Sequence, residues 1–319
     1  MGLVLPDRWI WDFWLVQDGL DHHVFFLQAA HEIGHPDERH WNVSIGHAVS
    51  RDLVDWELLP DALAPGPAGA WDDASTWTGS IVRHDGRWHL LYTGTSTRDD
   101  RLVQRVGLAT SDDLVVWTKH DGPVLESDPR WYETVDMTTW HDQAWRDPWV
   151  WWDAEESQFH ALVTARVREG ERGDRGTVAH ATSPDLVTWT VLPPVTPPLG
   201  FGQLGVPQVT EVDGRWYLVF CSDTETQGSV LAEQLGTGTF YLVGDSPTGP
   251  FRRVGSGVLE ADAQGSTYAG KLHRDNDGRL VFLAWHRTGP DGSFRGELSD
   301  PQLVSVRPDS TLALSPLAP

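Results

Sequence analysis

Alternating apolar and polar positions along the chain predict short β-strands, and no long segment follows a helical period. Three segments share the same turn dipeptide followed by an apolar alternating run, namely DGRWHLLY at 85–92, DGRWYLVF at 213–220 and DGRLVFLA at 277–284. Asp-Gly between two such runs is the strongest short-range signal for a β-hairpin. The segments HVFFLQ at 23–28 and QFHALV at 158–163 hold the same place in the pattern, so the chain contains five hairpins.

A second repeat follows the first three hairpins. The pattern S-x-D-L-V-x-W occurs at 50–56, 111–117 and 183–189, each time after a strand of small residues, and a degenerate copy stands at 246–251. Each unit then has four antiparallel strands, and the unit occurs five times. Radial repetition of this kind predicts an all-β fold, a five-bladed β-propeller that forms a single domain over residues 1–319. The alternative is a β-sandwich with coincidental turns.

Composition narrows the possible partners and the compartment. The formal net charge is -22 and the sequence pI is near 4.8, so the surface would repel nucleic-acid phosphates and anionic lipids. A single cysteine, Cys221, excludes an internal disulfide and any cysteine-based metal cluster. With no secretory leader or membrane-spanning run in the sequence, we expect a cytoplasmic protein. The 18 tryptophans are expected to wedge between sheets or to stack on sugar rings.

Candidate chemistry lies where the innermost strands begin, because these strands line the central tunnel of a propeller. The five segments are WDFW at 11–14, WTGS at 77–80, WRDP at 145–148, LGVP at 204–207 and TYAG at 267–270. They bring Asp12, Asp147 and Arg146 together with several indoles, which are costly groups to bury for packing alone. Glycoside hydrolysis needs carboxylates beside an anomeric carbon and aromatic faces to hold the ring. The alternative is that the two aspartates only cap turns.

These segments, together with Trp41 ahead of GHAVSRDL at 46–53, resemble the ordered sequence blocks of the glycoside hydrolase clan of families 32 and 68. The resemblance covers nearly the whole chain and implies a β-fructofuranosidase-like or levansucrase-like enzyme. Such an enzyme is a retaining hydrolase or transglycosidase that acts on small β-fructofuranosides such as sucrose, without a metal or other cofactor. The resemblance implies that Asp12 is the nucleophile and that Asp147, beside Arg146, holds fructose hydroxyls and stabilises the transition state. It also implies a set of residues that line the substrate pocket: Gln28, Trp41, Trp77 and Thr78, with Trp9, Trp11 and Trp14 as further walls.

The chain departs from the family pattern at the fourth inner strand. The family has a glutamate there as general acid/base, whereas this chain has Gly205 before Val206 and Pro207. Loss of a positioned acid costs about two to four orders of magnitude in rate, so slow turnover is expected. Asp223 or Glu225 could reach in as a substitute acid. We also expect no C-terminal β-sandwich of the family 32 kind, because the fifth blade extends past Trp285.

Two other functions stay open. A related propeller enzyme of the family 43 type would invert arabinofuranosides or xylosides, and a non-catalytic carbohydrate-binding protein would explain Gly205. The segment HEIGH at 31–35 matches a zinc-protease motif, but Gly34 and Pro36 disfavour the helix that this motif requires, so we expect no zinc site. The exact glycoside, the balance of hydrolysis and transfer, and the oligomeric state are left open by the sequence.

Overall fold

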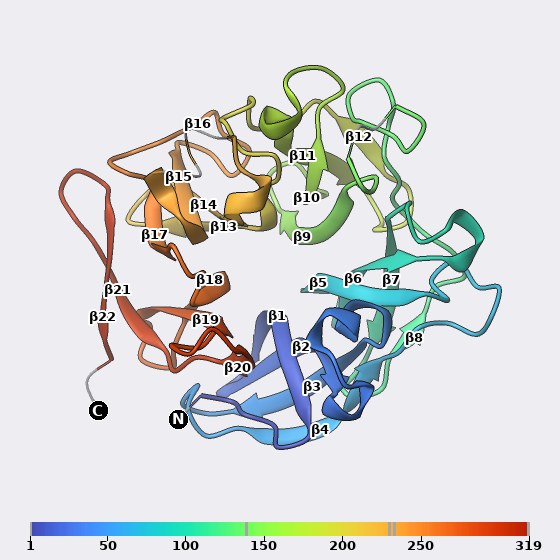
Figure 1. Cartoon of the computed structure of the whole chain (residues 1–319), viewed down its shortest axis with the longest axis horizontal. Helices are drawn as coiled ribbons and strands as arrows, with labels where there is room; N and C mark the ends of the chain where they lie inside the picture. The colour runs from blue at the N-terminus through green and yellow to red at the C-terminus, as the bar shows by residue number, and fades with distance from the viewer. Residues whose placement is uncertain (1, 138–139, 229–230, 232–233, 318–319) are drawn as a thin grey trace.

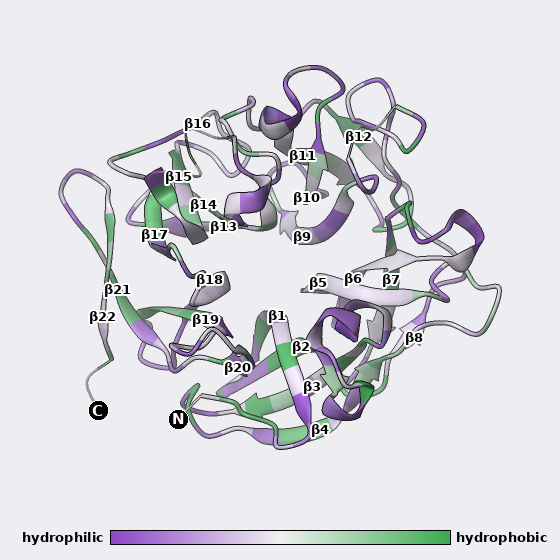
Figure 2. Cartoon of the chain, in the orientation of Figure 1, coloured by the Kyte–Doolittle hydropathy of each residue, from purple (hydrophilic) through white to green (hydrophobic). Residues whose placement is uncertain are grey.

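The computed structural model describes residues 2–137, 140–228, 231 and 234–317, and these residues form five β-sheets around a central axis (Figure 1). Each sheet follows the previous one in sequence, and its first strand lies nearest the axis. This arrangement confirms the predicted five-bladed propeller. Figure 2 shows hydrophobic segments on the strands, β3 and β17 among them, whereas the loops between strands are largely hydrophilic.

The first three blades are antiparallel sheets of four strands, as predicted. Their strands are β1 (Arg8–Asp18), β2 (Asp21–Ala30), β3 (Ser44–Ser50), β4 (Glu57–Leu63), β5 (Ser75–His84), β6 (Arg87–Thr95), β7 (Arg105–Ser111), β8 (Thr118–Lys119), β9 (Trp145–Asp153), β10 (Gln158–Arg166), β11 (Gly176–Ser183) and β12 (Thr190–Leu192). The 3-10 helices of the described chain are η1 (His31–Ile33), η2 (Pro36–Trp41), η3 (Thr97–Asp99), η4 (Arg172–Asp174) and η5 (Thr224–Thr226). None of the helices in this part of the chain is long and apolar enough to cross a membrane.

The fourth and fifth blades each have one strand more than the sequence repeat predicts. Their strands are β13 (Gly205–Val212), β14 (Arg215–Ser222), β15 (Thr237–Gly244), β16 (Phe251–Arg252) and β17 (Val258–Asp262) in blade four, and β18 (Thr267–Arg274), β19 (Leu280–Thr288), β20 (Phe294–Leu298), β21 (Gln302–Val306) and β22 (Leu312–Pro316) in blade five. The third-strand position of blade five is split, because β20 and β21 pair with successive parts of β19. The last strand of the described residues is β22. The amide of Leu298 donates to the carbonyl of Leu3 at 3.0 Å and so connects blade five to the segment before blade one.

All five inner strands carry a β-bulge at the same place, where the pairing with the second strand shifts register. The interruptions lie between Ile10 and Phe13, between Trp77 and Gly79, opposite Leu162 and Thr164, between Gly205 and Gln208, and between Tyr268 and Lys271. In blades three to five the bulged residue has a positive φ, at 58° for Asp147, 52° for Val206 and 50° for Ala269. A bulge bends the strand and redirects one side chain, so the repeated bulge turns one residue per blade towards the axis.

The repeated Ser-x-Asp-Leu segment is a turn held by its own side chains. In blade one, Oγ of Ser50 accepts from the amide of Leu53 at 2.9 Å, and Oδ1 of Asp52 accepts from the amides of Val54 and Asp55 at 2.9 and 2.8 Å. Leu53 takes a positive φ of 64° with its side chain fully buried. The motif is therefore retained in three blades because it fixes a strained leucine in the core.

Replacing Asp52 by Ala removes the acceptor for two backbone N–H groups. We expect the free energy of unfolding to fall by about 1–2 kcal/mol, measured by urea denaturation. Asp55→Ala in the same turn is the matched control, because the Asp55 carboxylate accepts no hydrogen bond in the described part of the chain, and its effect should stay within about 0.5 kcal/mol. Equal losses for the two variants would contradict the role given to the turn.

Histidine pairs connect the second and third strands in two of the blades. Nδ1 of His23 lies 2.9 Å from Nε2 of His47, and Nδ1 of His160 lies 2.9 Å from Nε2 of His180. Burial, reinforced by the partner histidine, lowers the pKa of His47 to about 3 and that of His180 to about 4. Both rings thus stay neutral in the folded protein under mildly acidic conditions.

Stability should consequently fall on mild acidification. The unfolded chain protonates these histidines below about pH 6.5 whereas the folded chain does not, so their contribution is complete above that pH and is lost as the pH falls towards the folded pKa values. Each such histidine should lower the free energy of unfolding by about 2 kcal/mol between about pH 7.5 and pH 5. Urea midpoints at the two pH values measure this, and His47→Gln should reduce the difference whereas His35→Gln, at an exposed site, should not. A pH-independent midpoint would contradict the buried neutral pairs.

Candidate active site

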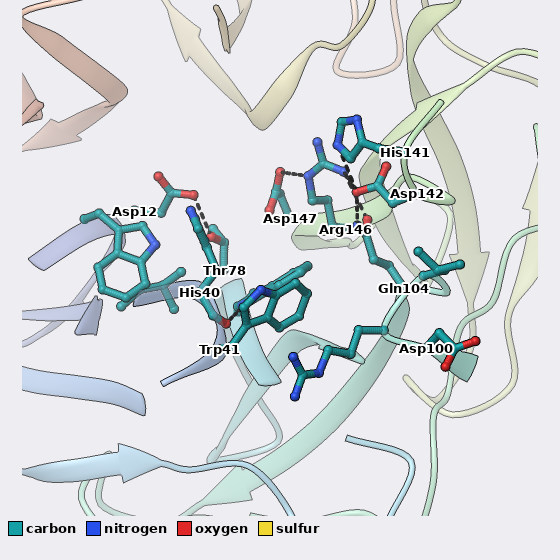
Figure 3. A pocket seen from close by; sticks show the side chains of 15 residues that line it. Asp12, His40, Trp41, Thr78, Asp100, Gln104, His141, Asp142, Arg146 and Asp147 are labelled. Atoms are coloured by element: carbon teal, nitrogen blue, oxygen red, sulfur yellow. Dashed lines mark hydrogen bonds and ion pairs between the residues drawn. The ribbon is translucent and has the colours of Figure 1, made fainter. Parts of the chain in front are cut away.

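A cavity of about 340 Å³ opens at the axis, between the inner strands of the first three blades and the loops that follow β2, follow β6 and precede β9. Figure 3 shows the side chains that line it, with the carboxylates of Asp12 and Asp147 directed towards one shared space. The lining consists of Trp11, Asp12, Leu27, His40, Trp41, Trp77, Thr78, Asp100, Arg101, Leu102, Gln104, His141, Asp142, Arg146 and Asp147. The structure therefore brings together seven of the sequence-predicted site residues: Trp11, Asp12, Trp41, Trp77, Thr78, Arg146 and Asp147.

Asp12 lies in the bulge of β1, and both of its carboxylate oxygens are held. Oγ1 of Thr78 donates to Oδ2 at 3.0 Å, and Nε1 of Trp285 donates to Oδ1 at 3.1 Å. Burial raises the pKa of Asp12, and the charge of Asp147 raises it further, while the two hydrogen bonds oppose the shift. The donors come from blades two and five, so the carboxylate orientation depends on the contacts of blade one with both neighbours.

Asp147 occupies the equivalent bulge of β9 and is almost completely buried. Its Oδ2 accepts from Oγ1 of Thr164 at 3.1 Å and from the amide of Val206 at 3.1 Å. Nε of Arg146 lies 3.5 Å from the same oxygen. Oδ1 has no hydrogen-bond partner among the described protein residues, so it can accept hydrogen bonds from the hydroxyl groups of a ligand in the cavity.

A chain of polar side chains extends from Arg146, and no sequence motif marks its other members. Nη1 of Arg146 donates to Oε1 of Gln104 at 3.1 Å, and Nε2 of Gln104 donates to Oδ2 of Asp142 at 2.7 Å. The amide of Trp145 also donates to Gln104, at 3.0 Å. Gln104 and Asp142 lie in loops that carry no repeat and no motif, and only a contact with Arg146 distinguishes them.

One wall of the cavity is aromatic. The rings of Trp41 and Trp77 have centroids 5.4 Å apart, and Nε1 of Trp77 donates to the carbonyl of His40 at 3.0 Å. Trp41 is 37% exposed, which leaves a face open to a ligand, and the Arg101 guanidinium lies 4.9 Å from its ring centroid. Burial lowers the pKa of His40 to about 3, so this ring stays neutral beside the cavity. An apolar wall opposite carboxylates is the arrangement that sugar binding requires.

Three of the predicted pocket residues lie elsewhere. Side chains alternate along a strand, so Leu27 faces the cavity whereas the neighbouring Gln28 points the other way and donates to Oγ of Ser44 at 3.1 Å. Trp14 is wholly buried and stacks on Phe25, so it belongs to the core. Trp9 lies against Phe294 of blade five with centroids 6.1 Å apart. Gln28, Trp14 and Trp9 therefore lie outside the set of side chains that line the cavity.

Gly205 occupies the position on β13 that Arg146 holds on β9. A Cβ atom added to Gly205 would meet only the carbonyl oxygen of Cys221 at 3.5 Å and the Tyr268 hydroxyl at 4.0 Å, which are ordinary contacts. The backbone of Gly205 is not in the left-handed region, so a Cβ atom is tolerated there without backbone strain. Gly205 lies outside the set of residues that line the cavity, and it places no carboxylate on the fourth inner strand.

The two proposed substitutes for that acid have other roles in the structure. Asp223 forms an ion pair with Arg287 and caps η5, where its Oδ1 accepts from the amide of Glu225 at 2.9 Å. Glu225 is exposed to solvent. Neither lines the cavity that contains Asp12 and Asp147.

The zinc-like segment does not form a metal site of the protease kind. Residues His31–Ile33 form a single 3-10 turn that ends at Gly34 with a φ of 89°, so the two histidines do not share a helix face. The group of described residues whose ligand atoms could reach one metal ion is Asp153, Glu156 and His160. It lies at the β9–β10 hairpin, at the end of β9 away from Asp147.

Comparisons with known proteins agree with this geometry. The chain matches the model of the Glycosyl hydrolases family 32 N-terminal domain over residues 15–293. It is 28% identical over 322 residues to a levanase of Bacillus sp. (strain L7), with 89% of this chain and 31% of the levanase covered. A sucrose-6-phosphate hydrolase of Zymomonas mobilis is 29% identical over 260 residues, which cover 77% of this chain and 46% of that protein. The chain therefore spans less than half the length of these curated relatives.

Solved structures show the same architecture. The inulosucrase from Halalkalicoccus jeotgali bound to kestose has a TM-score of 0.80 at 22% identity, with 97% of this chain and 87% of that chain covered. The likeness at this identity concerns the fold.

Proposed function

The chain belongs to the family 32 glycosyl hydrolases, and we propose that it is a retaining glycoside hydrolase or transglycosidase acting on small β-fructofuranosides, with Asp12 as nucleophile. The observation that carries the proposal is the shared cavity of Asp12 and Asp147, in which each carboxylate is fixed by donors from neighbouring blades. The relatives are named as a levanase and a sucrose-6-phosphate hydrolase, and the similar inulosucrase is described with kestose, which supports a fructoside as substrate.

In this mechanism the ionised Asp12 attacks the anomeric carbon of the fructosyl group, and the bond to the leaving group breaks with its electron pair. A covalent fructosyl ester forms and is then opened by water or by an acceptor hydroxyl. Asp147, with the free Oδ1 described above, would hold fructose hydroxyls, and the Trp41–Trp77 wall would cover the apolar face of the ring. A leaving group such as glucose needs a proton, and Gly205 cannot supply it.

A non-catalytic carbohydrate-binding function is the second candidate, and the observation that favours it is Gly205. Because a Cβ atom is tolerated at this position, an introduced glutamate can distinguish a disabled enzyme from a binding protein. A glutamate introduced there would extend from a Cβ atom that makes no close contact, towards the Tyr268 hydroxyl on the neighbouring inner strand.

Gly205→Glu should raise the rate of sucrose hydrolysis by about two to four orders of magnitude, because it restores a positioned proton donor. Release of glucose and fructose measures the rate. Gly205→Gln is the matched control, since it has nearly the same size without an acid, and it should stay at the native rate. The double variant Asp12→Asn with Gly205→Glu should lose the gain. A folded Gly205→Glu protein that binds fructose but gains no activity would support the binding function.

Stereochemistry separates the proposal from an inverting mechanism. The donor β-D-fructofuranosyl fluoride releases fluoride without a proton, so the native chain should act on it despite Gly205. In the presence of methanol we expect methyl β-D-fructofuranoside, with the anomeric configuration retained after two displacements, as read by NMR. An α-configured product would contradict Asp12 as a covalent nucleophile.

A further inference from the structure

Lys271 is a buried cation on the axis that the mechanism above does not use. It lies on β18, just beyond the bulge of blade five, and is only 3% exposed. Its Nζ donates to the carbonyl of Val206 at 2.8 Å and lies 5.8 Å from the ring centroid of Trp149. The chain has only one other lysine, Lys119, and that residue lies in blade two.

The burial of Lys271 is compensated by the site carboxylates. Loss of solvent lowers its pKa to about 8, while Cys221, Asp147 and Asp12 act in the opposite direction. An ammonium removed from water is tolerated only when opposite charge and hydrogen bonds offset the desolvation. The ammonium thus balances part of the negative charge that the two aspartates place in the core.

Val206 connects Lys271 to Asp147 through one peptide unit on each side. The amide of Val206 donates to Oδ2 of Asp147, and its carbonyl accepts from Lys271. Val206 has a φ of 52°, which is strained for a β-branched residue and persists only when the surroundings hold it. Lys271 therefore holds, from the carbonyl side, the residue whose amide binds Asp147.

The other two strained bulges have clamps from neighbouring strands as well. Oγ1 of Thr93 accepts from the amide of Asp147 at 2.9 Å, and Oγ1 of Thr239 accepts from the amide of Gly270, beside Ala269, at 3.1 Å. Blades three and five use a neutral threonine for this purpose. In blade four the bulged Val206 is held by the charged Lys271. The charge of Lys271 also acts on groups that it does not contact.

The charge of Lys271 also reaches Asp12. Asp147 opposes ionisation of Asp12, whereas Lys271 favours it. The other titratable or charged groups that face Asp12 are Arg39, Cys221 and Tyr268, and Arg146 faces Asp147 from the rim. Arg39 belongs to η2, whereas Lys271 lies on β18 and lines a second cavity together with Trp149 and Gln208. Lys271 is thus a buried cation of the inner strands that interacts electrostatically with both carboxylates.

We propose that Lys271 is a positioning residue for the fructosyl-transfer site, which holds Val206 in place against Asp147 and keeps Asp12 in its ionised, nucleophilic form. This inference rests on the proposed function. It assigns to the fifth inner strand a part in catalysis that acts through Asp12 and Asp147, without contact between Lys271 and the substrate.

The test is the pH dependence of kcat/KM for β-D-fructofuranosyl fluoride with the native chain and with Lys271→Met, Lys271→Gln and Lys271→Arg. In Lys271→Met the acid limb, which reports ionisation of the nucleophile, should move up by about one pH unit, and kcat/KM at neutral pH should fall about tenfold or more. Lys271→Gln keeps a donor for Val206 but loses the charge, so its acid limb should also move up. Lys271→Arg keeps both and should leave the acid limb in place.

An alkaline limb gives an independent readout. Loss of the Lys271 proton should lower kcat/KM of the native chain above about pH 8, and this limb should be absent in Lys271→Arg, because arginine does not titrate there. Lys119→Met is the matched control, because it removes the ion pair with buried Asp72 in blade two. It should lower stability without moving the acid limb.

The outcomes separate this inference from the proposed function. Absence of fluoride release that depends on Asp12, in every variant and in the native chain, would overturn the proposed function and this inference with it. Release that depends on Asp12 but has the same acid limb in the native chain and in Lys271→Gln would overturn the role of Lys271 alone. If Lys271→Met does not fold, Lys271→Gln and the native alkaline limb still decide the question.

Discussion

The site depends on one constraint: the backbone groups at the inner edge of each innermost strand need hydrogen-bond partners. A propeller turns these edges towards its axis, where backbone N–H and C=O groups have no further strand to pair with, and buried groups of this kind must find partners. Side chains from adjacent blades supply them, as Ser80 does for the carbonyl of Pro148 and the amide of Val150, and Gln208 for the carbonyl and amide of Leu272. The same kind of cross-blade bond holds Asp12 and Asp147. Hydrogen bonds between adjacent blades therefore both close the ring of blades and orient the two carboxylates.

The same arrangement determines how the charges of the site interact. Two carboxylates share a desolvated cavity in a chain of net charge -22, and their mutual repulsion raises the pKa of Asp12 beyond the effect of burial. Arg146, which lies beside Asp147, and the buried Lys271 offset part of that repulsion. A nucleophile must be ionised to attack, so the cations of the inner ring matter to chemistry as much as to folding.

The repeats in the sequence predicted the blades and the starts of the inner strands, because hairpin and turn signals are local. The starts of the inner strands occupy one fixed place in that repeat. The sequence therefore revealed Asp12, Thr78, Arg146 and Asp147, which lie there. Gln28 lies outside the cavity, and strand alternation could have assigned the neighbouring Leu27 to it. Gln104 and Asp142 lie in loops without a period, and no local pattern reveals that the Lys271 side chain reaches across to blade four. The extra strands β17 and β20 likewise lack a repeated motif.

In the proposed mechanism Asp12 forms a covalent bond to the fructosyl group. Because Gly205 leaves the site without a general base, this intermediate should be opened slowly and should accumulate. The native chain would be mixed with β-D-fructofuranosyl fluoride, quenched, digested and examined by mass spectrometry. We predict that one peptide, that containing Asp12, gains the mass of a single fructosyl residue, and that Asp12→Asn shows no such peptide. Consumption of the fluoride without a labelled Asp12, or with the label on Asp147, would contradict the account.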